Sequence, residues 1–135
     1  MIKVKMITLL NSTEALQNLA KKDLKARLAL RVSKLLKAAD TEIQSFNDAR
    51  MNLIQKYGEK DSNNELIKDE EGNCKIPESN TSTFTNELNE LVAEEVEINV
   101  NKIKLEDIED LEFTPLEMSL LEDFIEDEEK EETIE

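Results

Sequence analysis

The sequence contains no histidine, one cysteine, two glycines and two prolines. Without histidine the chain lacks the commonest general base and the commonest transition-metal ligand. The one cysteine, Cys74, can form neither an internal disulfide nor a structural zinc site, and no histidine is present to activate it as a nucleophile. With Gly58 and Gly72 as its only glycines, the chain has no glycine-rich phosphate loop. We therefore expect a protein that is not an enzyme and holds no cofactor or metal.

Aromatic residues and long apolar runs are also scarce. No apolar run is long enough to span a membrane, and residues 1–10 lack the apolar segment and cleavage site of a signal peptide. The five aromatic residues fall at positions expected in the core, which leaves no stacking platform for nucleic-acid bases. They are Phe46, Tyr57, Phe84, Phe113 and Phe124. We expect a cytoplasmic protein that does not contact a membrane and does not bind nucleic acid directly.

Charge is distributed unevenly along a chain whose net charge is −15. Residues 1–60 carry 12 basic and 6 acidic side chains, whereas residues 61–135 carry 5 basic and 26 acidic ones. One explanation is that the two halves attract each other within the fold, and another is that the charged side chains are simply solvated. The third is that one half binds an external partner of opposite charge.

The candidate partner-binding residues follow from these clusters. The basic candidates come from a lysine- and arginine-rich segment over residues 21–37, and they are Lys21, Lys25, Arg27, Arg31 and Lys34. The acidic candidates come from the second half, and they are Glu94, Glu95, Glu97, Glu106, Asp107, Glu109, Asp110, Glu122 and Asp123. The sequence does not decide which of the two sets meets a partner.

The longest periodic segment, residues 24–57, predicts a long central helix. Its apolar residues recur every three or four positions and so share one face. Gly58 follows where a left-handed residue would end the helix. At 1.5 Å per residue the helix would be roughly 50 Å long. A strict heptad would place Glu42 and Lys56 in the seam, so we favour a helix packed against its own chain over a dimeric coiled coil, and both monomer and homodimer stay open.

Two segments alternate between apolar and polar side chains, which predicts half-buried strands over residues 1–8 and 95–100. Antiparallel pairing of these strands would bring together four side chains of opposite charge. These are Lys3, Lys5, Glu95 and Glu97. A smaller hairpin is predicted over residues 65–76, around its Gly-Asn turn.

Three shorter helices complete the prediction. The first covers residues 12–22 behind an Asn11 cap and breaks near residues 21–23, and the second covers residues 83–93. The third begins at Thr114, where Thr, Pro and Glu at the first positions form a capping box. Its residues at core spacing are Leu116, Leu120, Leu121, Phe124 and Ile125.

These elements predict an α+β fold that is dominated by helices. We expect one domain over residues 1–125, with a long central helix and a small antiparallel sheet or hairpin. Residues 126–135 hold seven acidic residues and one lysine, which predicts a flexible acidic tail.

The order of the segments resembles a known family. A short lysine-bearing strand precedes a long helix that ends in Gln-Lys-Tyr-Gly-Glu, and an acidic Gly-Asn hairpin precedes Lys75-Ile76. Then follow Glu-Glu-Val-Glu-Ile, Phe113-Thr114-Pro115 and an apolar, acidic last helix. Over residues 1–126 this order resembles a family of small uncharacterised proteins from phages and prophages of low-GC Gram-positive bacteria. The resemblance implies a phage origin and an accessory role, and it carries no catalytic signature.

We expect a non-enzymatic module that binds a host or phage protein. An acidic surface can occupy a positively charged nucleic-acid channel by placing carboxylates where phosphates would lie. In size and charge the chain looks like phage-encoded inhibitors of host-defence nucleases, such as anti-CRISPR proteins, so a basic nucleic-acid-binding complex is one expected partner. The alternative is a virion-assembly factor or minor structural protein that uses its long helix. Only the first kind of binding should fall steeply with salt.

Overall fold

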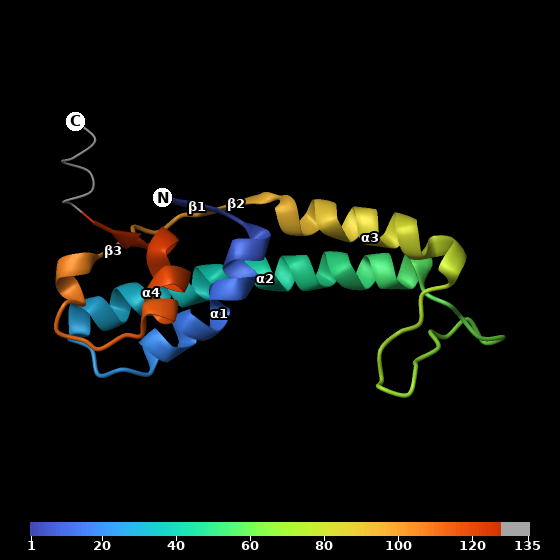
Figure 1. Ribbon diagram of the computed structural model, residues 1–135, viewed down its shortest axis with the longest axis horizontal. Helices are drawn as coiled ribbons and strands as arrows, with labels where there is room; N and C mark the ends of the chain where they lie inside the picture. The colour runs from blue at the N-terminus through green and yellow to red at the C-terminus, as the bar shows by residue number, and fades with distance from the viewer. Residues whose placement is uncertain (128–135) are drawn as a thin grey trace. The chain divides into compact units, whose positions relative to one another are not determined.

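The computed structural model describes residues 1–127 and confirms a helix-dominated α+β fold (Figure 1). The chain divides into two compact units. Unit 1 combines residues 1–43 with the segment from Glu95 onward, and unit 2 is Gln44–Glu94. The single domain expected over residues 1–125 stays a prediction. Of the predicted acidic tail, residues 128–135 lie outside the described part of the chain.

A two-stranded antiparallel sheet closes unit 1. Strand β1 (Ile2–Lys5) pairs with β2 (Glu95–Ile98), with Ile2 opposite Ile98 and Val4 opposite Val96. All four of these apolar side chains are buried. On the other face, the Lys3 Nζ lies 3.5 Å from a carboxylate oxygen of Glu97. The predicted pairing and its charge match are therefore confirmed.

Helix α1 (Met6–Ala20) begins earlier than the sequence suggested. We expected a strand through residue 8 and a helix cap at Asn11, and both expectations are wrong. Met6 continues the alternation of the strand, yet it also starts the helical spacing that buries Leu9, Leu16 and Leu19. Because Met6 satisfies both periods, the sequence pattern could not show where one element gives way to the other.

Helix α2 (Ala26–Tyr57) confirms the long central helix and the break before it. Residues 26–43 belong to unit 1 and residues 44–57 to unit 2. Every residue of the predicted apolar face is buried or half-buried. Gly58 follows the helix, but the expectation that it is left-handed is wrong. Its φ is not positive, whereas that of Gly72 is. A Cβ at Gly58 would meet the Ile54 carbonyl oxygen at 2.5 Å, so lack of space explains this glycine.

Within residues 1–127, no helix has the length and apolar character needed to cross a membrane. The apolar face of α2 is too narrow for that, because charged and polar residues occupy the rest of its circumference.

The last elements of unit 1 are short. Strand β3 (Ile103–Lys104) pairs in parallel with β4 (Ile125–Glu126). Between them lie a 3₁₀ turn η1 (Leu105–Asp107), helix α4 (Pro115–Leu121) and a second 3₁₀ turn η2 (Glu122–Phe124).

Helix α4 begins as predicted but ends early. The capping box of Thr114 and Glu117 is present, with the Thr114 hydroxyl accepting from the Glu117 amide at 3.1 Å. The helix stops at Leu121, where the chain tightens into η2 and then extends into β4. The expectation that Leu116 packs in the core is wrong, because its side chain is 70% exposed.

Unit 2 contains the later half of α2, helix α3 (Glu78–Ala93) and the segment between them (Figure 1). Helix α3 starts directly after Pro77, five residues before the predicted start, and Asn80 donates to the Tyr57 carbonyl at 3.1 Å. None of its residues is fully buried, although Phe84, Leu88 and Leu91 are half-buried. Unit 2 therefore has a thin core.

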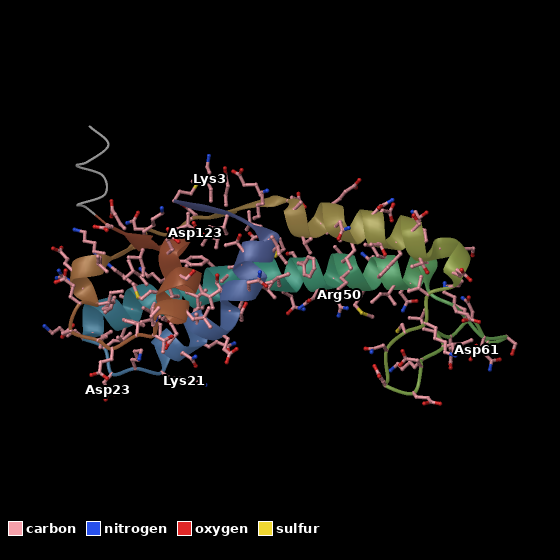
Figure 2. The ribbon with its side chains drawn as sticks, viewed as in Figure 1. Lys3, Lys21, Asp23, Arg50, Asp61 and Asp123 are labelled. Atoms are coloured by element: carbon pink, nitrogen blue, oxygen red, sulfur yellow. The ribbon has the colours of Figure 1, made fainter. Side chains whose placement is uncertain are left out.

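The predicted hairpin is an irregular double turn held by two isolated bridges (Figure 2). The Asp61 carboxylate accepts hydrogen bonds from the backbone amides two and four residues later in the chain. The Asp69 carboxylate does the same in the second turn. Each turn then passes through a left-handed residue, Asn64 with φ of 63° and Gly72 with φ of 88°. These aspartates thus stabilise the two turns.

A buried hydroxyl joins α1 to α4. Ser12 is 1% exposed, and its Oγ lies 2.7 Å from the Thr8 carbonyl oxygen and 2.8 Å from that of Leu120. Leu120 lies in the last turn of α4, where helix carbonyls lose their partners within the helix. Ser12 therefore caps a helix end that lies far along the chain.

We expect Ser12→Ala to lower the free energy of unfolding by about 1–2 kcal/mol, because the Leu120 carbonyl would lose its donor. Denaturant unfolding followed by circular dichroism measures the change. Ser119→Ala, which removes an exposed serine of α4, is the control and should cost less than about 0.5 kcal/mol. Equal losses in the two variants would contradict the capping role.

Candidate functional site

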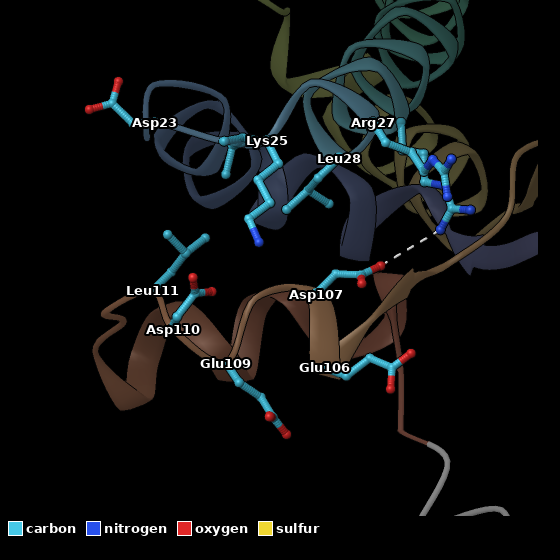
Figure 3. Close-up of a pocket in the computed structure, with 11 residues that line it drawn as sticks. Asp23, Lys25, Arg27, Leu28, Glu106, Asp107, Glu109, Asp110 and Leu111 are labelled. Carbon is cyan, nitrogen blue, oxygen red and sulfur yellow. Dashed lines mark ion pairs between the residues drawn. The ribbon is translucent and has the colours of Figure 1, made fainter.

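The structure brings basic and acidic candidates together in a groove of unit 1 of about 520 Å³ (Figure 3). We call it the mixed-charge groove. One wall is the start of α2 with the residues just before it, and the other is η1 with the turn that follows. Leu24, Leu28 and Leu111 supply its apolar lining. Its charged lining residues are Asp23, Lys25, Arg27, Arg31, Glu106, Asp107, Glu109 and Asp110.

One ion pair crosses the mixed-charge groove. The Arg31 Nη1 lies 3.7 Å from an Asp107 carboxylate oxygen, and the two side chains are 42% and 39% exposed. The Lys25 side chain also extends towards Asp107 and Asp110, whereas Glu106 and Glu109 point away from α2 (Figure 3). Because such exposed pairs contribute about 0–1 kcal/mol, the two walls attract each other only weakly.

The remaining basic candidates lie outside this groove. Lys21 is exposed in the connection between α1 and α2 (Figure 2), and Lys34 is exposed on α2. Neither lines the mixed-charge groove. Of the five basic candidates from residues 21–37, which we call the basic row, three thus line the groove and two lie on the open surface.

Lys22 is a residue that we did not select from the sequence. Its ammonium donates to the Glu112 carbonyl at 2.9 Å and lies 5.0 Å from the centroid of the Phe113 ring. Lys22 therefore binds Glu112 and Phe113, which follow directly after the acidic residues of the mixed-charge groove. No sequence signal could identify it, because its partners lie 90 residues away.

The acidic candidates of β2 are matched by lysines. In the strand register, Glu95 lies opposite Lys5 and Glu97 opposite Lys3. Glu94 precedes the strand and belongs to unit 2. All three carboxylates are exposed, but two of them have a lysine across the sheet.

Glu122 and Asp123 line a second groove of unit 1, of about 550 Å³, which we call the acidic groove. It is formed by Lys102 just before β3, by η1, by α4 and by the residues that follow α4. Its apolar lining comes from Leu105, Pro115, Met118 and Ile125. Its charged lining residues are Lys102, Glu122, Asp123, Glu126 and Asp127. Four carboxylates thus accompany one ammonium group.

Charged and apolar side chains line both grooves. Across residues 1–127, no three acidic or thiol side chains gather as metal ligands would. In unit 2, a hydrogen bond that the Lys56 ammonium donates to the Tyr57 hydroxyl raises the pKa of Lys56 above its usual 10.5, and the charges of Tyr57 and Glu87 add to this rise.

Comparisons of this chain with protein-family models, with curated proteins and with solved structures found no match.

We expect Lys22→Met to lower the free energy of unfolding by about 1–2 kcal/mol, because both the hydrogen bond and the ring contact disappear. Thermal or denaturant unfolding measures the effect. Lys21→Met changes the charge equally at an exposed neighbour and should cost less than about 0.5 kcal/mol. If the neighbour costs as much, Lys22 has no special structural role.

Proposed function

We propose that this chain is a phage-encoded, non-enzymatic module that binds a basic partner protein through the carboxylates of unit 1. The partner class is a nucleic-acid-processing complex or a host-defence nuclease of the kind that anti-CRISPR proteins inhibit. Binding would take place in the cytoplasm of the bacterial host.

The observation that carries this proposal is the excess of exposed carboxylates in unit 1. Residues 95–127 carry 12 acidic and 2 basic side chains, whereas residues 1–43 carry 9 basic and 4 acidic ones. Even with its basic row, the described part of unit 1 keeps a net charge of −5. All eight acidic candidates from Glu95 to Asp123 are exposed.

Electrostatics explains why such a surface suits a basic partner. The ion pairs Lys3–Glu97 and Arg31–Asp107 join exposed groups, so they reduce the negative charge of this surface only weakly. The carboxylates of unit 1 together create a negative potential that attracts and orients a basic protein. A channel that binds nucleic-acid phosphates offers the opposite potential.

The second proposal is a virion-assembly factor or minor structural protein. Leu30 and Met51 favour it, because these side chains of α2 are 57% and 42% exposed. An apolar interface built on α2 would give binding that survives high salt.

Capture from a lysate of the bacterial host, at about 0.05 M and about 0.5 M salt, provides the partner for the test. We expect binding to weaken about tenfold when three carboxylates of unit 1 are neutralised, because each contributes to the attraction. This variant combines Glu106→Gln, Glu109→Gln and Asp123→Asn. Calorimetric titration of the captured partner measures the change.

The matched control removes three exposed carboxylates of unit 2 and leaves the same net charge. It combines Glu65→Gln, Glu70→Gln and Glu71→Gln and should change the affinity less than about threefold. If the two triple variants lose affinity equally, unit 1 is not the binding surface. A partner that stays bound at high salt would favour the assembly proposal instead.

A further inference from the structure

We propose that the acidic groove is where the partner docks, and that it takes a protein segment in which lysines or arginines flank an apolar side chain. This inference rests on the proposed function and names the part of unit 1 that performs it. Its lining residues come from Lys102 and η1 on one side and from α4, η2, β4 and Asp127 on the other.

The first argument is the difference in charge between the two grooves. In the mixed-charge groove, an incoming cation competes with Lys25, Arg27 and Arg31, which line the groove, and Arg31 already pairs with Asp107. In the acidic groove, Lys102 is the one cationic side chain among the lining residues. A basic segment therefore meets fewer competing cations among the residues that line the acidic groove.

The second argument is the apolar lining of the acidic groove. Leu105, Met118 and Ile125 are half-buried and line it from three different elements. An unbranched, polarisable methionine adapts to apolar side chains of different shapes. An apolar centre with a charged rim is the usual anatomy of a protein interface.

Charge also distinguishes between possible occupants. The chain's own residues 128–135 include five glutamates and one lysine, and so have the same sign as the rim. A second copy has a net charge of −15 and is repelled as well. The groove suits a basic segment of a different protein.

The test uses two synthetic peptides with the same number of lysines. One is an amphipathic helix of leucine and lysine, and the other is an oligolysine. We expect the leucine–lysine peptide to bind about tenfold more tightly, because it alone can bury an apolar side chain in the groove. Calorimetry at low salt measures both affinities.

Methionine methyl groups report where the peptide binds. The four methionines are Met1, Met6, Met51 and Met118, of which Met118 alone lines the acidic groove. In spectra of the protein labelled with ¹³C at its methionine methyl groups, we expect the leucine–lysine peptide to shift Met118, while Met51 in unit 2 stays in place.

Matched substitutions on α4 give an independent measure. We expect Met118→Gln to weaken binding of the leucine–lysine peptide about tenfold, because the apolar anchor loses its contact. Leu116→Gln, on the same helix but outside the groove, should change the affinity less than about twofold. Asp123→Asn should weaken both peptides and is expected to leave the fold intact, because Asp123 is exposed.

Three results would overturn the inference. If both peptides bind equally and Met118 does not shift, the acidic surface binds cations without the groove, and the proposed function survives alone. If neither peptide binds at low salt, the proposed function fails together with the inference. If Met118 shifts as the protein alone is concentrated, a second copy occupies the groove.

Discussion

The pairing of β1 with β2 is the interaction on which unit 1 depends. It joins the first residues of the chain to Glu95–Ile98, and the facing side chains Ile2 and Ile98 are 0% and 1% exposed. Closing so long a stretch of chain costs entropy, which the burial of both strands' apolar faces must offset. Because β2 leads directly to β3 and α4, the pairing also determines where the carboxylates lie. The position of the charged surface thus depends on the burial of the apolar side chains of β1 and β2.

The charge asymmetry of the sequence acts in two ways within this frame. Part of the acidic half faces the protein's own basic row, as the Arg31–Asp107 pair illustrates. Four further carboxylates line the acidic groove around Met118 and Ile125, where Lys102 is the cationic lining residue. Internal attraction and the acidic groove therefore each account for a part of the asymmetry. This division is what turns an acidic composition into a specific docking hypothesis.

Local patterns predicted local structure well. The apolar face of α2, the capping box at Thr114 and the antiparallel pairing of β1 with β2 all followed from residue spacing. The start of α1 did not, because Met6 fits both a strand and a helix. The two grooves and the contact of Lys22 with the Phe113 ring could not be predicted. They join segments that lie far apart in the sequence, and residue spacing gives no information about such contacts.

Native-state hydrogen exchange would test most directly whether the strand pairing supports the acidic groove. The account predicts that the amides bonded across β1 and β2 exchange with the same free energy as those of Ile108 and Met118, which bond within η1 and α4. Such agreement would show that the groove opens only when the sheet opens. The account would be contradicted if Ile108 and Met118 exchanged readily while β1 and β2 stayed protected, because the groove would then not depend on the pairing.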